Sequence, residues 1–110
     1  MGTRGAARNN LDCEMIHKCS ITGEDYKGFG NNAWPFNGRC SDLSNDRYVL
    51  RARFYLISLE ILKETEPLNP FLSYVYSTLL DENIPNVLKL SAFRALERAL
   101  KSANRKKTIQ

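Results

Sequence analysis

Residues that could do metal or thiol chemistry gather in the first 40 positions of the chain. They are one histidine, His17, and three cysteines, Cys13, Cys19 and Cys40. Structural zinc takes four thiolate or imidazole ligands, so these four side chains form a candidate metal site. The spacing Cys-x3-His-x-Cys is not one of the common zinc patterns. We therefore expect no cofactor and keep two alternatives: zinc at these residues, or a Cys19–Cys40 disulfide in an oxidising compartment.

Catalysis finds little support in the same residues. A thiol nucleophile would have to pair His17 with Cys13 or Cys19, and sequence neighbours seldom have the geometry that such a pair needs. Gly28-Phe29-Gly30 lacks the third glycine of a dinucleotide fingerprint, and no phosphate-binding P-loop is present. We predict a protein that is not an enzyme, with no catalytic residue and no small-molecule substrate.

Basic side chains are a better basis for function. The net charge is +4, and the whole excess lies beyond residue 45, where 11 basic residues face 7 acidic ones. Cations beside aromatic rings, here Trp34, Tyr48 and Tyr55, can engage phosphates and stack on bases. We therefore predict nucleic-acid binding; the alternative is that the arginines satisfy backbone carbonyls of the loops. The candidate residues are Arg39, Arg47, Arg51, Arg53, Arg94, Arg98, Lys101, Arg105, Lys106 and Lys107.

Three segments of the N-terminal half resemble a known kind of metal-binding loop. They are Cys19-Ser20-Ile21-Thr22-Gly23, the stretch Gly28-Phe29-Gly30-Asn31-Asn32-Ala33-Trp34-Pro35, and Gly38-Arg39-Cys40-Ser41-Asp42-Leu43-Ser44-Asn45. Over about 27 residues the chain resembles small zinc-ribbon or zinc-knuckle proteins of bacteriophages and large DNA viruses. The resemblance implies a viral or phage-type protein with two knuckles, each of which supplies two cysteines to one zinc ion.

Most ligands of that pattern are replaced in this chain. Cys19 is kept, Thr22 stands at the second position, and Ser41 and Ser44 stand at the positions of the second pair. Cys40 matches an extra cysteine beside that pair. Because a hydroxyl is a poor zinc ligand, we expect the ordinary site to be lost and hydrogen bonds from these hydroxyls to hold the knuckles instead.

The sequence pattern around these residues predicts an α+β fold that is mainly α, in a single domain over residues 1–110. Hydrophobic residues make up 43% of the chain and charged residues 25%, which is typical of a globular protein. We expect a flexible arm over residues 1–10, a degenerate zinc-ribbon-like half with a short β-hairpin over 11–45, a three-helix half over 46–105 and a basic tail over 106–110. Gly- and Asn-rich turns dominate the loop half, where we expect two short strands at most. Its predicted small core is Tyr26, Phe29, Trp34 and Phe36.

The helices are predicted from apolar spacing and end signals. The first begins at Asn45 or Asp46, carries Leu50, Phe54, Ile57 and Ile61 at helical spacing and ends before Pro67. The second begins at Asn69-Pro70 and ends at 81–83, with Phe71, Leu72, Val75, Leu79 and Leu80 on its buried face. The third begins at 83–85 and buries Val87, Leu88, Phe93, Leu96 and Leu100. Short connections predict an antiparallel bundle with a frayed basic end.

The first helix also suggests a second kind of function. Leu56, Leu59 and Leu62 widen its apolar stripe until most of its surface is apolar, which is typical of a central helix. A protein–protein adaptor or assembly component could bury this face, or the Tyr74/Tyr76 edge, against a partner. We therefore expect nucleic acid or a protein as the partner.

No export signal is recognisable in residues 1–10, so we expect a cytoplasmic protein with reduced cysteines. The longest apolar stretch, Phe54 to Leu62, is interrupted by Ser58 and Glu60 and falls short of the roughly 20 residues needed to cross a bilayer. We therefore predict no membrane association.

Overall fold

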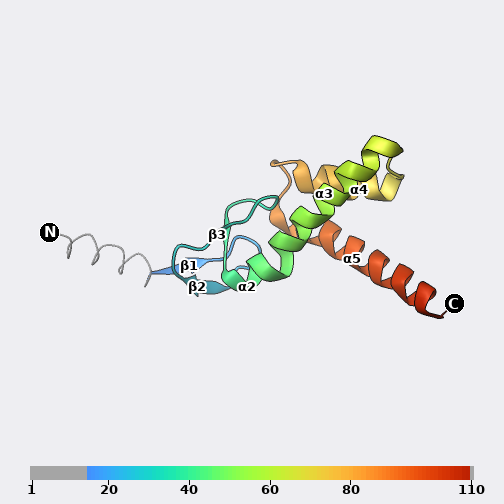
Figure 1. Cartoon of the computed structure of the whole chain (residues 1–110). Helices are drawn as coiled ribbons and strands as arrows, with labels where there is room; N and C mark the ends of the chain where they lie inside the picture. The colour runs from blue at the N-terminus through green and yellow to red at the C-terminus, as the bar shows by residue number, and fades with distance from the viewer. Residues whose placement is uncertain (1–14, 110) are drawn as a thin grey trace.

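The computed structural model describes the backbone of residues 15–109 and the side chains of residues 15–103. The fold is α+β and mainly helical, as predicted, with two small antiparallel hairpins followed by three long helices (Figure 1). The hairpins are formed by β1 (Ile16–Lys18) with β2 (Asp25–Lys27) and by β3 (Asn31–Asn32) with β4 (Arg39–Cys40). The helical elements are α2 (Asp42–Ser44), η1 (Asn45–Val49), α3 (Leu50–Thr65), α4 (Pro70–Leu80) and α5 (Asn86–Ile109).

Two hairpins, rather than the single one predicted, build the N-terminal half. In the first, His17 lies opposite Tyr26, and the connecting turn is closed by the amides of Cys19 and Gly23, which donate to the carbonyls of Glu24 and Cys19 (both 2.8 Å). Gly23 sits in this turn at a φ of 78°, a conformation that favours glycine. The Ser20 amide donates to the Arg39 carbonyl (2.9 Å), so the turn of the first hairpin is joined to β4 of the second.

Two asparagines tie the hairpins to the last helix. The Asn37 amide donates to Asn86 Oδ1 (2.7 Å), and Asn86 Nδ2 donates to the carbonyls of Asn37 (2.9 Å) and Ser20 (2.8 Å). Asn37 Nδ2 donates in turn to the Ile84 carbonyl (3.0 Å). The predicted Asn37-Gly38 turn therefore also holds the first turn of α5 against the loops.

The helical half begins earlier than predicted. The N-cap is Ser41, whose hydroxyl accepts from the Ser44 amide at 3.1 Å, instead of Asn45 or Asp46. The chain then runs through α2 and the π-helical turn η1 into α3 without a break. The second helix begins at Asn69-Pro70 as predicted, with the Asn69 side chain accepting from the Leu72 amide (2.8 Å).

One core serves both halves. Phe93 of α5 is fully buried and packs edge-on against Phe36 of the loops and Tyr48 of η1, with ring centroids 6.3 and 5.8 Å apart. The separate small core predicted for the loops is wrong in two of its four residues. Phe29 and Trp34 are about half exposed, because the loops bury Phe36 against the helices and need no aromatic cluster of their own.

The first helix buries only one side, although its sequence predicted a central helix. Ala52, Leu56 and Leu59 face the core, whereas Leu50, Phe54, Ile57 and Ile61 lie on the outer side and are 48, 66, 61 and 60% exposed. A helix that is apolar nearly all round offers two stripes of equal spacing, and here the stripe that contains the small residue Ala52 packs inward. The outer stripe therefore has no covering element among residues 15–103.

Helices α4 and α5 bury narrower faces than predicted. In α4, Val75 and Leu79 are fully buried, while Phe71 and Leu80 are partly exposed at the edge. In α5, Phe93 and Leu96 are buried, but Val87, Leu88 and Leu100 are exposed. The backbone of α5 stays helical to Ile109, so the predicted frayed tail is wrong for 105–109.

A lysine takes a place in the core that the sequence did not reveal. Lys89 is fully buried, and its ammonium donates to the Leu79 carbonyl at the end of α4 (2.5 Å). Burial lowers the pKa of Lys89, and the nearby charges of Asp81 and Glu82 act in the opposite direction. The cation thus closes the C-terminal end of α4, where the helix dipole is negative. None of the described helices is both long enough and apolar enough to cross a membrane.

Candidate functional site

The four knuckle positions of the N-terminal half meet in the folded chain. Cys19 and Thr22 come from the turn after β1, and Ser41 and Ser44 come from the start of α2. Cys19 Sγ lies 3.2 Å from Ser44 Oγ, and Thr22 and Ser41 both hydrogen-bond to the Cys19 sulfur. We call these four residues, together with Glu24, the knuckle cluster.

Glu24 completes the hydrogen bonding of the knuckle cluster. Its carboxylate accepts from the hydroxyls of Ser41 (2.9 Å) and Ser44 (3.4 Å). Ser41 also caps α2, so its hydroxyl donates to Glu24 while its oxygen accepts from the Ser44 amide. Hydrogen bonds between the hydroxyls, the Glu24 carboxylate and the Ser44 amide therefore hold the knuckle cluster together.

The knuckle cluster changes the acidity of the thiol at its centre. Burial raises the pKa of Cys19, but hydrogen bonds from the side chains of Ser44 and Thr22 and from the amides of Ser41 and Thr22 lower it more, to about 6. Burial and the neighbouring charge of Cys19 raise the pKa of Cys40, which remains a neutral buried thiol near pH 7.

The alternative zinc set is not assembled within the described residues. Over residues 15–103 no group of three or more His, Cys, Asp or Glu side chains is placed to hold a metal ion. His17 stacks against Tyr26 on the hairpin, with ring centroids 5.6 Å apart. Cys19 and Cys40 are both buried free thiols, so the disulfide alternative is not formed. Cys13 lies outside the described residues.

Two of the predicted nucleic-acid ligands bind loop carbonyls instead. Arg39 donates from Nε to the Phe29 carbonyl (2.8 Å) and from a terminal nitrogen to the Gly30 carbonyl (3.0 Å). Arg53 donates in the same way to the carbonyls of Trp34 (2.7 Å) and Asn32 (2.9 Å). Arg39 thus binds the segment between β2 and β3, and Arg53 binds β3 and the β3–β4 loop. Carbonyl binding of this kind is the alternative that the sequence left open for the arginines.

Two further arginines at the junction pack within the fold. Arg51 forms an ion pair with Glu97 of α5 (3.1 Å), and Tyr55 donates to the same carboxylate (2.8 Å). Burial and the Glu97 carboxylate raise the pKa of Tyr55 to about 12. Arg94 lies over the Tyr48 ring, 5.9 Å from its centroid. Arg47, in η1, is exposed.

The remaining predicted cations lie along α5. Arg98 and Lys101 are exposed on α5, beside Leu96 and Leu100, which line a groove with α3 and α4. Arg105, Lys106 and Lys107 continue the same helix, and their side chains lie outside the described residues. The structure thus separates the ten predicted ligands into a junction group, mostly engaged in the fold, and an α5 group.

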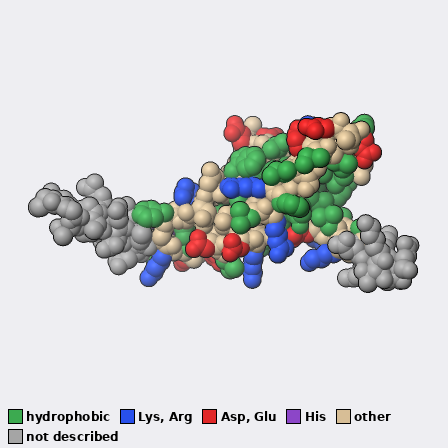
Figure 2. All heavy atoms as spheres, viewed as in Figure 1, with side chains coloured by type: hydrophobic (Ala, Val, Ile, Leu, Met, Phe, Trp, Pro, Cys, Tyr) green, Lys and Arg blue, Asp and Glu red, His purple; other side chains and the backbone are tan. Residues whose placement is uncertain are grey.

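A row of four apolar side chains on α3 lies on the surface, although the sequence predicted a central helix. We call Leu50, Phe54, Ile57 and Ile61 the α3 ridge. Figure 2 shows hydrophobic side chains gathered over α3 and α4 on this face of the molecule. A groove runs along each side of the ridge, with cavity volumes of about 400 and 280 Å³.

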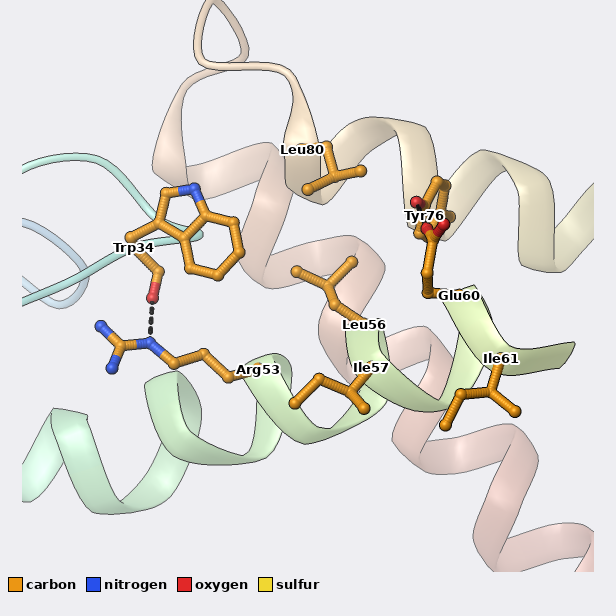
Figure 3. Close-up of a pocket in the computed structure, with 8 residues that line it drawn as sticks. All are labelled: Trp34, Arg53, Leu56, Ile57, Glu60, Ile61, Tyr76 and Leu80. Carbon is orange, nitrogen blue, oxygen red and sulfur yellow. Dashed lines mark hydrogen bonds between the residues drawn. The ribbon is translucent and has the colours of Figure 1, made fainter. Parts of the chain in front are cut away.

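The larger groove has polar groups at both ends and apolar side chains between them. We call it the Trp34 groove; its eight lining residues are labelled in Figure 3. Arg53 bonds to the Trp34 carbonyl at one end, and Glu60 accepts from the Tyr76 hydroxyl at the other. Leu56 and Leu80 lie between these ends (Figure 3). The smaller groove lies on the other side of the ridge and includes Leu62, Leu72 and Leu96.

Helical periodicity identified the ridge residues but could not tell that they face outward. Their one distinguishing signal is the alanine on the opposite stripe, because a small residue lets two helices approach closely. No protein family model, no curated protein and no solved structure gives a significant match to this chain.

Proposed function

We propose that this chain is a non-enzymatic protein-interaction component that binds a protein partner through the α3 ridge. One observation carries the proposal: four large apolar side chains, each about half or more exposed, form one continuous row between two apolar grooves. Contiguous exposed apolar surface of this kind marks interaction sites in folded proteins. Burying one such side chain contributes about 1.5–3 kcal/mol, so a partner that covers the row gains several times that amount.

The charges of the junction favour this proposal over the use of the same region for nucleic acid. Arg39 and Arg53 satisfy loop carbonyls and Arg51 pairs with Glu97, so a phosphate would have to compete with these contacts. Residues 19–45 resemble viral and phage zinc-knuckle proteins. We therefore propose that the chain is an assembly component of a viral or phage type.

Replacing Phe54 by the photocrosslinker p-benzoylphenylalanine should capture the partner, because this residue projects from the ridge and is similar in shape to the probe. The captured protein should be identified by mass spectrometry, purified and titrated against the wild-type chain. Ile57→Glu should weaken its binding by at least about tenfold, because it buries a charge in an apolar interface.

Val87→Glu is the matched control, because Val87 is an equally apolar residue, 71% exposed, at the start of α5, and it lines neither groove. It should leave the affinity unchanged. Equal binding by the wild type and Ile57→Glu, with both folded by circular dichroism, would contradict a partner site on the ridge.

Nucleic-acid binding stays a second candidate because of the α5 group. Arg98, Lys101 and Arg105 recur at spacings of three and four residues, a spacing that places them on one face of a helix. Arg98 and Lys101 are exposed there. A row of cations on a helix can follow a phosphate backbone.

The double variant Arg98→Glu/Lys101→Glu tests this candidate. Wild-type affinity for a DNA duplex should fall steeply with added salt, by a log–log slope of about −0.9 for each phosphate contact. The double variant should reduce both the affinity and the slope, whereas Lys27→Glu, on β2 of the first hairpin, should change neither. Salt-independent binding, or equal binding by the double variant, would rule out the α5 face as a nucleic-acid site.

A further inference from the structure

Resting on the proposed function, we propose that the partner of the α3 ridge is a second copy of this chain. The two ridges pack antiparallel about a twofold axis, and each ridge lies in the Trp34 groove of the other copy. The docking surface thus consists of the α3 ridge and the Trp34 groove, and its occupant is α3 of the second copy.

The spacing of the ridge fits a helix-to-helix contact. Its residues follow at intervals of four, three and four positions, which is the a/d spacing of a two-helix seam. Such a seam inserts each side chain as a knob between residues of the facing helix. The Trp34 groove beside the ridge supplies the matching hole, since Leu56 and Leu80 line its middle. A groove lined in this way fits an apolar helix better than an extended or charged segment.

The charges of the groove select the direction of the occupant. Arg53, Glu60 and Glu64 lie on the same side of α3, because seven and four residues complete about two turns and one turn. On the side of α3 that faces the Trp34 groove, Arg53 therefore lies toward the N-terminal end of the helix, and Glu60 and Glu64 lie toward its C-terminal end. A parallel second copy would place Arg53 against Arg53 and Glu60 against Glu60. An antiparallel copy places the carboxylates of each chain beside Arg53 of the other.

The same arrangement pairs the apolar residues. When Arg53 of one copy meets Glu60 or Glu64 of the other, the twofold axis falls near Ile57. Phe54 of each copy then lies opposite Ile61 of the other, so both large side chains are covered. Arg53 can keep its contacts to the loop carbonyls, since Nε and one terminal nitrogen make them and a guanidinium has a second terminal nitrogen that can donate. Because the contact is the same patch on both copies, it closes as a dimer and does not propagate.

Sedimentation velocity on the purified full chain tests the dimer. The wild type should be dimeric with a Kd of about 1 µM, a usual strength for a small apolar interface. Ile57→Glu should raise this Kd at least about tenfold because it places two charges near the axis. Glu64→Lys should also weaken the dimer, because it sets a cation beside Arg53 of the other copy. Val87→Glu should leave the dimer intact.

Cysteine crosslinking tests the direction. Single variants Phe54→Cys and Ile61→Cys, both in a Cys13→Ser background, are mixed and oxidised. The antiparallel arrangement predicts crosslinks between position 54 of one copy and position 61 of the other. Crosslinks that join 54 to 54 and 61 to 61 would overturn it in favour of a parallel pair.

The outcomes separate this inference from the proposed function. A monomer at about 100 µM, or a dimer that Ile57→Glu does not affect, overturns the second-copy inference. If the crosslinker at position 54 then captures a different protein, and this protein binds Ile57→Glu more weakly than the wild type, the proposed function stands and only the second-copy inference fails. A monomer that captures no protein overturns both.

Discussion

Replacing Thr22, Ser41 and Ser44 together by cysteine is expected to turn the knuckle cluster into a zinc site. The side chains of Thr22 and Ser44 and the backbone amide of Ser41 already contact the Cys19 sulfur, and Ser44 Oγ lies 3.2 Å from it. Four thiolates around one zinc ion stand about 3.8 Å apart, given a Zn–S bond of about 2.3 Å, so the cluster needs only a small expansion. Apparent binding free energies of such sites are about 10–16 kcal/mol near pH 7, and a large part of this should appear as added stability.

The measurement is the zinc content of the triple variant together with its thermal unfolding with and without chelator. One zinc ion per chain and a large loss of stability on chelation are expected. Adding Cys19→Ser to the triple variant leaves three thiolates and should weaken zinc binding strongly. A folded triple variant that binds no zinc would show that the four positions do not converge as described, and one zinc ion in the wild type would contradict a metal-free cluster.

The second large effect is a dependence of stability on pH that comes from Cys19. Its pKa is about 6 in the folded chain and has an ordinary value of 9.0 when the thiol is exposed in the unfolded chain. Between pH 6 and pH 9 the thiol is ionised in the folded chain but still protonated in the unfolded chain. The free energy of unfolding therefore rises with pH over this range. The slope is at most about 1.4 kcal/mol per pH unit, and the total is at most about 4 kcal/mol. The contribution is complete above pH 9 and is lost as the pH falls through 6.

Urea unfolding of the wild type and of Cys19→Ser at several pH values between 6 and 9 measures this contribution. The difference in unfolding free energy between the two proteins should grow as the pH rises, because serine keeps the shape of the side chain but does not ionise. Cys40→Ala is the control, since Cys40 stays neutral in the folded chain over most of this range. A difference between the wild type and Cys19→Ser that is constant with pH would mean that the knuckle cluster does not hold a thiolate.

The sequence determined the local structure of this protein well. Hydroxyl residues at three of the four knuckle positions predicted hydrogen bonds there, because serine and threonine side chains readily bond to nearby backbone groups. Asn69-Pro70 predicted the start of α4, because its capping oxygen and fixed φ act within one turn of the chain. Each of these features depends on residues close in sequence.

The residue at which the first helical segment begins was harder to predict. Ser41 caps α2 while its hydroxyl donates to Glu24, which lies 17 residues earlier in the chain. The choice of Ser41 over Asn45 or Asp46 therefore depends on a contact with the first hairpin. A cap that serves two elements at once is visible only after the two have met.

The tertiary structure alone decided which side of α3 faces the core and what the charged residues do. Periodicity gives the stripes of a helix, but on a helix apolar all round it does not say which stripe packs, since that depends on where α4 and α5 approach. Likewise, nothing in the sequence marks Lys89 as buried, and two roles stay open for Arg53; in the fold, Lys89 closes the end of α4 and Arg53 holds a loop. The free energy of burying a charge or exposing a ridge depends on partners distant in the sequence, and these are set only when the elements pack together.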